Sequence, residues 1–212
     1  MIEKINYVVI EGPIGVGKTS LATRLTERLR AHSILEQPEA NPFLERFYRD
    51  SARYALPTQL AFLFQRIRQL REFGRRELFD QTFVADFLLE KDALFASLTL
   101  AEDELHLYQQ IYENIAVQAP TPDLVIYLEA SPASLLERIA ERGRPMEISI
   151  SEVYLEQLCE AYTSFFYRYD TAPLLTVNTE HLDPANDDAD FELLLDRVRQ
   201  MRGRREFFNR GD

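Results

Sequence analysis

Short apolar runs alternate along the chain with longer stretches in which apolar positions recur at helical spacing. Five runs are predicted as buried parallel strands because they are short and mostly apolar: Lys4–Ile10, Ser33–Leu35, Thr82–Ala85, Leu124–Leu128 and Leu174–Val177. Apolar residues at i, i+3, i+4 and i+7 predict helices between them, as in "TQLAFLFQRIRQLREF" within 42–78 and "ELHLYQQIYENIAVQ" within 87–119. The alternation predicts an α/β fold, a doubly wound five-stranded parallel sheet flanked by helices, with ligands at the carboxyl ends of the strands.

The length of 212 residues suits a single domain spanning residues 1–212. The polar, acidic segment 181–190 is predicted to be a solvated connection before the last helix. The arginine-rich tail, residues 202–212, is predicted to face solvent, and no chemistry is assigned to it. The single Cys159 excludes an intramolecular disulfide and a multi-cysteine metal site.

Net charge narrows the class of partner. A formal charge of −11 disfavours unspecific binding to nucleic acid or to an anionic membrane, since either requires a cationic surface. The N-terminal residues show no signal-peptide pattern, and no apolar run approaches the ~20 residues of a membrane span. We therefore expect a cytoplasmic protein that acts on a small molecule, with no nucleic acid and no membrane as partner.

The stretch "VVIEGPIGVGKTSLATRL", residues 8–25, contains the pattern G-x-x-x-x-G-K-[ST]. In such a loop, backbone N–H groups wrap a polyphosphate, the lysine reaches the outer phosphates and the hydroxyl ligates Mg²⁺. The predicted phosphate-binding residues are Gly12, Pro13, Ile14, Gly15, Val16, Gly17, Lys18 and Thr19, with Thr19 as the metal ligand. The alternative is a plain strand-to-helix turn, but the apolar strand before the loop and the helical spacing of leucines after it favour a nucleotide site.

Phosphoryl transfer also needs a group that takes the proton from the incoming hydroxyl. Glu36 directly follows the predicted strand "SIL", where a side chain at the strand end can face the bound phosphates. We therefore interpret Glu36 as the general base. A carboxylate at this position could instead only cap the next helix.

The segment "LLERIAERGRPMEIS" carries Arg138, Arg142 and Arg144 on a helix that runs into a loop marked by glycine and proline. Arginines at i and i+4 share a helix face, so a lid of about residues 138–150 could close over ATP and neutralise charge on the transferred phosphoryl group. The alternative is a solvated face, which the alternation with Glu137 and Glu141 supports.

Five segments together resemble the deoxynucleoside kinases, in particular the bacterial deoxyadenosine/deoxyguanosine kinase branch. They are "GPIGVGKT", "ILEQPEANPFLERFY", "FLFQRIRQL", "KDALFA" and "ERGRPME", in this order and at suitable separations, and the resemblance covers roughly residues 5 to 180. It implies a P-loop kinase fold, and an enzyme of nucleotide salvage that uses ATP and Mg²⁺ to phosphorylate the 5′-hydroxyl of a deoxyribonucleoside. It also implies a homodimer.

The resemblance also implies roles for residues of the acceptor site. Glu36 matches the carboxylate that activates the 5′-hydroxyl, and Tyr48 and Glu147 match the pair that binds the sugar 3′-hydroxyl. Gln59 matches the glutamine that reads the base, and Arg66, on the same predicted helix, matches an arginine close to the base and the reacting end. Arg142 and Arg144 match the arginines of the lid. Taken singly, these residues could be packing or surface positions; their joint spacing favours the functional interpretation.

The segment "TFVADFLLEKDALFA" departs from the family pattern. Many members have an acidic residue followed by Arg and Ser at the end of the third strand, whereas no arginine follows Asp86. By unbroken alignment Asp86 falls where that arginine would be, and Lys91 falls where several relatives have a base-reading aspartate. We predict that Asp86 still serves as a strand-end carboxylate near Mg²⁺, and that Lys91 or Arg66 supplies the missing cation.

Three hypotheses follow, of which the first is favoured. The first is an ATP- and Mg²⁺-dependent deoxynucleoside kinase with a purine substrate. The second is a nucleoside monophosphate kinase of the thymidylate kinase type, whose acceptor phosphate would need cations where Glu36 stands. The third is a catalytically silent nucleotide-binding subunit of a larger assembly, against which Lys18, Glu36, Arg142 and Arg144 argue.

Overall fold

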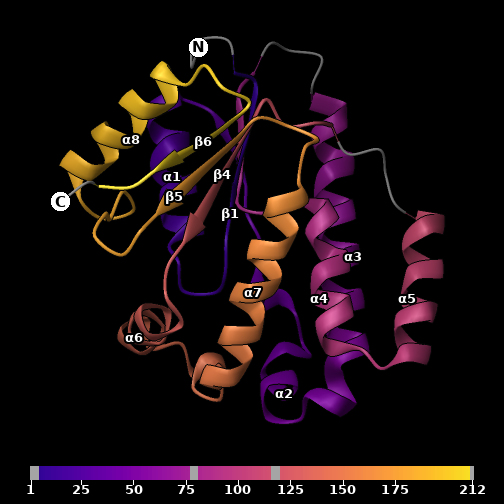
Figure 1. Cartoon of the computed structure of the whole chain (residues 1–212). Helices are drawn as coiled ribbons and strands as arrows, with labels where there is room; N and C mark the ends of the chain where they lie inside the picture. The colour runs from indigo at the N-terminus through magenta and orange to yellow at the C-terminus, as the bar shows by residue number, and fades with distance from the viewer. Residues whose placement is uncertain (1–4, 77–80, 116–119, 211–212) are drawn as a thin grey trace.

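The computed structural model describes residues 5–76, 81–115 and 120–210, in which six parallel strands form one sheet flanked by helices (Figure 1). The strand order is β2-β3-β1-β4-β5-β6. The strands are β1 Tyr7–Glu11, β2 His32–Ile34, β3 Phe83–Ala85, β4 Leu124–Glu129, β5 Leu174–Asn178 and β6 Arg205–Phe208. No helix in this described part of the chain is long and apolar enough to cross a membrane.

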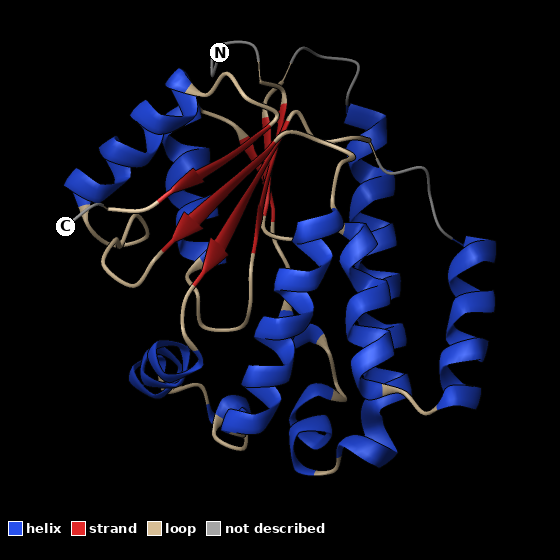
Figure 2. Cartoon of the chain, in the orientation of Figure 1, coloured by secondary structure: helices blue, strands red, loops and turns tan. Residues whose placement is uncertain are grey.

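Helices cover both faces of the sheet (Figure 2). The helices are α1 Lys18–Leu29, α2 Leu44–Arg49, α3 Ser51–Arg76, α4 Asp92–Thr99, α5 Glu102–Ile115, α6 Pro132–Arg142, α7 Glu152–Arg168 and α8 Asp188–Gln200, with short 3-10 turns η2 Pro38–Ala40, η4 Leu89–Lys91 and η5 Pro145–Glu147. Helices α1 and α8 lie on one side, and α3, α4, α5 and α7 lie on the other (Figure 1). Helices α2 and α6 lie beyond the carboxyl ends of the strands, where the site is expected.

Burial explains why the central strands read as continuous apolar runs. All five residues of β1 are buried, because β3 and β4 pair with it on either edge and helices cover its two faces. The register pairs Val9 with Ala85 of β3 and with Val125 of β4. The carboxyl ends of these three strands therefore meet at one edge of the sheet, and the residues that follow them come together there.

The first glycine of the loop after β1 is needed for space as well as conformation. Gly12 has a φ of 147°, in the region that favours glycine, and a Cβ there would lie 2.3 Å from the carbonyl oxygen of Leu128. Gly17, with a φ of 98°, is the N-cap of α1, so the loop passes directly into the helix N-terminus. These two turns set the path of the phosphate loop, residues 12–19.

The α/β fold with a parallel sheet and flanking helices is confirmed, and all five predicted strands are present with boundaries shifted by up to three residues. The predictions at Lys4, Leu78 and residues 116–119 lie outside the described residues. The strand count was wrong, since Arg205–Phe208 forms β6 and pairs with β5, whereas most residues of 202–210 are exposed, as predicted for the tail. The segment "REFF" has no buried face to produce an apolar pattern, because β6 is an edge strand and its residues alternate between exposed and half-buried.

Candidate active site

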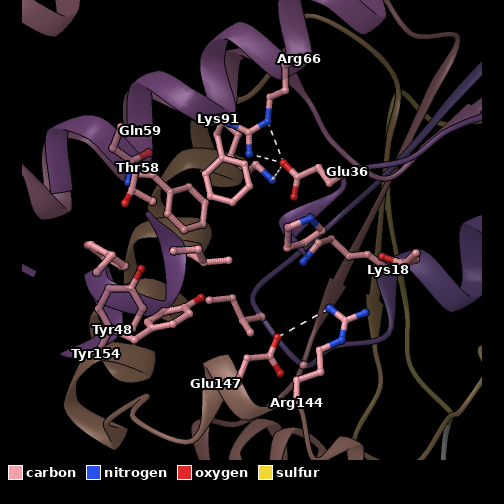
Figure 3. Close-up of a pocket in the computed structure, with 18 of the residues that line it drawn as sticks. Lys18, Glu36, Tyr48, Thr58, Gln59, Arg66, Lys91, Arg144, Glu147 and Tyr154 are labelled. Atoms are coloured by element: carbon pink, nitrogen blue, oxygen red, sulfur yellow. Dashed lines mark hydrogen bonds and ion pairs between the residues drawn. The ribbon is translucent and has the colours of Figure 1, made fainter. Parts of the chain in front are cut away.

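A pocket lies at the carboxyl ends of the strands, between the phosphate loop, α3, α7 and the turn that follows α6 (Figure 3). The predicted site residues that line this pocket are Ile14, Gly15, Lys18, Thr19, Glu36, Tyr48, Gln59, Arg66, Lys91, Arg142, Arg144 and Glu147. Segments that are far apart along the chain therefore converge on one cavity.

The phosphate loop holds its lysine over the cavity. Lys18 donates hydrogen bonds from Nζ to the carbonyl oxygens of Gly12, at 2.7 Å, and Pro13, at 2.9 Å. Burial, followed by the charge of Lys91, lowers the pKa of Lys18 to about 8. An anion that enters the loop therefore stabilises the charged form of Lys18, because a polyphosphate supplies a full negative charge where the backbone carbonyls supply only partial ones.

Asp86 connects the phosphate loop with the end of β2. Its Oδ2 accepts a hydrogen bond from the hydroxyl of Thr19 at 2.5 Å, and its Oδ1 accepts the backbone N–H of Glu36 at 2.7 Å. Burial and the nearby charge of Glu36 raise the pKa of Asp86. With its proton directed to Asp86, the Thr19 hydroxyl keeps its oxygen lone pairs for a cation, so this donor fits Mg²⁺, which takes one or two protein ligands and the rest from phosphates and water.

Five charged side chains form the densest electrostatic feature of the site, here named the ionic cluster: Glu11, Glu36, Arg66, Lys91 and Asp92. Arg66 pairs with Glu36 and, through its other terminal nitrogen, with Asp92. Lys91 pairs with Glu11 at 3.1 Å and approaches Glu36 at 3.7 Å. All of these side chains are buried or nearly so, so their charges act in a medium that screens them poorly.

The two oxygens of Glu36 have different surroundings. The Nε of Arg66 donates to Oε1 at 2.7 Å, and the contacts with the Arg66 Nη2 and with Lys91 reach the same Oε1 atom. Oε2 accepts no hydrogen bond from the described residues and points into the pocket (Figure 3). Desolvation opposes ionisation, but the charges of Arg66 and Lys91 outweigh it and lower the pKa of Glu36 to about 2. Glu36 is therefore an ionised acceptor with one free oxygen at neutral pH.

The lid side of the pocket contains fewer ion pairs, and its arginines are more exposed than the cations of the ionic cluster. Arg142 donates to Oε2 of Glu147 from Nη2 at 2.7 Å and from Nε at 3.1 Å. Arg144 approaches Oε1 of Glu147 at 3.8 Å and pairs with Glu39 at 3.3 Å. Gly143, with a φ of 64°, ends α6 and turns the chain so that both arginines face Glu147.

Aromatic and amide side chains form the remaining wall. Burial, followed by the proximity of Tyr154 and Glu147, raises the pKa of Tyr48, so its hydroxyl stays protonated beside the Glu147 carboxylate. Gln59 is buried, and its Nε2 donates to the hydroxyl of Thr99 at 3.2 Å, which fixes the direction of the amide. A wall of this kind suits a flat, mostly apolar ring with a few polar groups at its edge.

Six predicted site residues are not part of the pocket lining: Gly12, Pro13, Val16, Gly17, Asp86 and Arg138. Arg138 donates from its guanidinium to the hydroxyl and carbonyl oxygens of Thr179, at 3.0 and 2.5 Å, and so ties α6 to the end of β5. Asp86 is buried behind Thr19 rather than at the pocket surface. The carboxylate that meets Arg66 in the structure is Asp92, the residue after Lys91.

Sequence reasoning missed Glu11, Asp92 and Tyr154. Glu11 is the last residue of β1, so the strand-end argument that selected Glu36 would also have selected it. Asp92 stands next to Lys91, but nothing in the sequence shows which of the two faces Arg66. Tyr154 carries no signal beyond its place on an amphipathic helix, and only the fold brings it beside Tyr48.

Comparison with known proteins identifies the family of the chain. The model of the deoxynucleoside kinase family matches residues 8–201. A deoxyguanosine kinase of Bacillus subtilis (strain 168) is 35% identical over 200 residues, which cover 92% of this chain and 97% of that protein. A deoxyadenosine/deoxycytidine kinase of the same organism is 30% identical over 207 residues, 93% of each protein. The solved structure of a deoxyadenosine kinase from M. mycoides with bound dATP is similar with a TM-score of 0.79 and 26% identity, covering 92% of this chain and 99% of that one.

Proposed function

This chain belongs to the deoxynucleoside kinase family and is a phosphotransferase, and from that premise we propose that it transfers the terminal phosphoryl group of ATP to the 5′-hydroxyl of a purine deoxynucleoside. The observation that carries the proposal is Glu36. It is ionised at neutral pH, one of its oxygens is held by Arg66, and the other points into the same cavity that Lys18 lines.

On the donor side, the phosphate loop and the lid receive ATP. The backbone N–H groups of residues 12–19 wrap its phosphates and Lys18 contacts the outer ones. Thr19, oriented by Asp86, would hold Mg²⁺, which when bound offsets the charge of the nucleotide phosphates. Arg142 and Arg144 leave their pairs with Glu147 and Glu39 in part and turn toward the phosphoryl group as it moves.

On the acceptor side, the pocket orients the nucleoside so that its 5′-oxygen meets Glu36. Tyr48 and Glu147 hold the sugar 3′-hydroxyl, and Gln59 reads the base edge. The 5′-oxygen attacks the terminal phosphorus of ATP while its proton passes to Oε2 of Glu36, and ADP leaves with the electron pair of the broken P–O bond. The products are a deoxynucleoside 5′-monophosphate and ADP, with the proton on Glu36 released to solvent afterwards.

The charge of this end of the pocket argues for a hydroxyl acceptor. The ionic cluster holds three carboxylates and two cations, and although Arg66 and Lys91 also line the cavity, their charges are paired with carboxylates, whereas Oε2 of Glu36 has no partner among the described residues. An acceptor phosphate would be repelled there, because two like charges in a poorly screened site oppose each other strongly. A neutral 5′-hydroxyl is attracted, since it can donate its hydrogen bond to the same oxygen.

The experiment compares acceptors. Purified protein is supplied with ATP and Mg²⁺ and with deoxyguanosine, deoxyadenosine, thymidine or thymidylate, and the products are separated by chromatography. We expect the two purine deoxynucleosides to give the highest kcat/KM and the product to carry its phosphate at the 5′ position. Thymidylate as the best acceptor would replace the proposal with a nucleoside monophosphate kinase. Binding of ATP without turnover of any acceptor would replace it with a silent nucleotide-binding subunit.

The family resemblance also supports a homodimer as part of this proposal. Analytical ultracentrifugation of the purified chain measures it directly, and a monomer at micromolar concentration would contradict it. The same sample, treated with a chelator of divalent cations, tests the requirement for Mg²⁺, since turnover should stop and return when Mg²⁺ is restored.

A further inference from the structure

Glu11 is fully buried, and both oxygens of its carboxylate are occupied. Oε1 accepts the backbone N–H of Leu88 at 2.7 Å and pairs with the ammonium of Lys91 at 3.1 Å. Oε2 accepts the backbone N–H of Gly12 at 3.0 Å and the hydroxyl of Tyr162 at 3.2 Å. One side chain thereby joins the first turn of the phosphate loop, the segment after β3 and helix α7.

Lys91 is held in one place by this carboxylate. Its side chain is 3% exposed, and its ammonium lies between Glu11, at 3.1 Å, and Oε1 of Glu36, at 3.7 Å. A lysine has a flexible stem with rotatable donors, so its charge stays at a defined position only when a partner fixes it. Glu11 is that partner, and it is itself fixed by the N–H groups of Leu88 and Gly12.

The position of Lys91 matters because of the oxygen that it approaches. The Nε and Nη2 of Arg66 also contact Oε1 of Glu36, so all three cationic contacts fall on one oxygen. The side chain of Glu36 is thereby prevented from rotating to exchange its two oxygens, and Oε2 remains directed at the pocket. A carboxylate that swings by 1 Å loses much of its value as a base.

We infer that Glu11 and Lys91 act as one positioning unit for the reaction, holding Oε1 of Glu36 together with Arg66 so that Oε2 meets the 5′-hydroxyl. This inference rests on the proposed function and names two residues in addition to the general base. Neither side chain takes part in bond making. They increase the fraction of time that Oε2 of Glu36 points into the pocket, so their loss should lower kcat rather than weaken deoxynucleoside binding.

A purely structural role for the pair would leave a different trace. A buried ion pair is weak evidence for stability, since two well-packed neutral residues of similar volume often serve as well or better, whereas one charge left alone is costly. Replacing both partners by neutral residues of similar shape should therefore restore the stability that either single replacement removes. If the pair positions Glu36, the double variant should regain its stability but not its turnover.

The test uses the variants Glu11→Gln, Lys91→Met and their combination in the full chain. Each replacement keeps approximate length and removes charge, and the combination leaves the net charge of the ionic cluster unchanged. We expect each single variant to have a lower midpoint of thermal unfolding and a kcat reduced by about tenfold or more, with KM for deoxyguanosine within about threefold of wild type. The double variant should regain most of the unfolding midpoint and keep the kcat of the worse single variant.

Three results would overturn the inference. The first is recovery of kcat together with stability in the double variant, which makes the pair structural. The second is wild-type kcat in both single variants. The third is a double variant whose loss is the product of the single losses, because two residues that act as one unit are not additive. If a single variant does not fold, the double variant, which has no unpaired buried charge from this pair, still decides between positioning and structure.

Asp123→Asn is the matched control. Asp123 accepts the backbone N–H groups of Asn6 and Tyr7 at 2.7 and 2.9 Å, so it is a second carboxylate that holds backbone next to β1, at the opposite end of that strand. Its replacement should lower the unfolding midpoint and leave kcat unchanged. The wild type is measured first with deoxyguanosine and deoxyadenosine. An inactive wild type refutes the proposed function and the inference with it, whereas an active wild type with unaffected variants refutes the inference alone.

Discussion

Charges reach the pocket from two regions that differ most in their contact with water. In the ionic cluster the side chains of Arg66, Lys91 and Asp92 are 5%, 3% and 1% exposed. On the lid, Arg142 and Arg144 are each 36% exposed, and Arg144 pairs with a Glu39 that is 57% exposed. Glu11 and Glu36 sit at or just after strand ends, Arg66 sits on the long helix α3, and Lys91 and Asp92 sit where η4 meets α4, while the lid charges sit at a helix end and in a turn.

This difference in exposure predicts which charged side chains keep their positions when substrates bind and which change partners. Breaking one partner out of a buried pair costs roughly 3–5 kcal/mol, which holds the ionic cluster in one arrangement. Exposed pairs are worth roughly 0.2–1 kcal/mol, so Arg144 can leave the exposed Glu39 for phosphate at little cost. Glu147 is only 7% exposed and pairs with both arginines, so one of them can turn to phosphate while the other still balances its charge. We therefore expect the base to be preorganised and the phosphate clamp to form only when the nucleotide is present.

The largest loss of activity is expected on replacement of Lys18, because this side chain lies beside both the ionic cluster and the lid. Lys18 lines the pocket between the ionic cluster and the lid, and its hydrogen bonds within the described residues go to the backbone carbonyls of Gly12 and Pro13. Lys18→Ala should reduce kcat/KM by about 10³-fold or more with little change in the unfolding midpoint, because its contacts serve the phosphates rather than the core. Steady-state kinetics and a thermal melt check it. Near-normal turnover with unaltered ATP affinity would contradict the assignment of the phosphate loop.

The second prediction tests the ionic cluster. Glu36→Gln is nearly isosteric but does not accept a proton, so it should still bind ATP and deoxynucleoside and lose ~10²-fold or more in kcat. Binding is measured by calorimetry and turnover by the release of ADP. Full activity in this variant would show that another group, or water, takes the proton.

The lid should respond differently from the ionic cluster. Arg144→Ala is expected to lower kcat by at least ~10²-fold with a smaller change in deoxynucleoside affinity, because its charge is needed most as the phosphoryl group moves. Its stability should be unchanged, since its pairs are partly exposed. Arg28→Ala, which removes an exposed pair with Glu192 on the other side of the molecule, is the control. If only the nucleoside KM rises, Arg144 belongs to the acceptor site.

A smaller and more selective effect is expected at Tyr48. Tyr48→Phe removes one hydroxyl beside Glu147, so kcat/KM should fall about tenfold for a 2′-deoxynucleoside and change little for its 2′,3′-dideoxy analogue, which lacks the group to be held. Comparing the two substrates in one preparation cancels errors in active enzyme concentration. Equal losses on both substrates would assign Tyr48 to packing.

The last prediction concerns stability and pH. Because the folded protein lowers the pKa of Glu36 from 4.5 to about 2, its ionisation contributes stability that is present above pH 4.5 and is lost as pH falls from 4.5 toward 2. The contribution is on the order of 3 kcal/mol. The difference in unfolding free energy between wild type and Glu36→Gln should therefore be constant from pH 5 to 7 and shrink below pH 4.5. A difference that does not depend on pH would show that Glu36 is not charged in the folded state.

Local patterns predicted most of the architecture and the phosphate loop. The glycine spacing, the strand before it and the helix after it are all short-range features, so residues 8–29 could be interpreted from the sequence alone. The same holds for Glu36, because the end of a predicted parallel strand is also the place where a ligand is expected. These interpretations needed no knowledge of which helix packs on which.

The electrostatic partners could not be predicted in the same way. Glu11 and Lys91 are 80 positions apart, and their contact depends on the exact turn of η4 at the end of the segment after β3. Whether Lys91 or Asp92 faces Arg66 depends on a rotation of about 100° between consecutive helical residues, which the sequence alone does not fix. β6 was missed because an edge strand with alternating exposed and half-buried residues shows no continuous apolar run in the sequence.

The sixth strand also bears on how the chain behaves when it is shortened or extended. β6 covers the free edge of β5, an almost wholly buried apolar strand that would otherwise present a row of unpaired N–H and C=O groups. A chain that stops at residue 201 would expose that edge as a template on which other copies can add strands, and we expect it to precipitate during purification. Expression tags at the carboxyl end should follow a polar spacer, and fusion at this terminus carries a solubility cost that fusion elsewhere avoids.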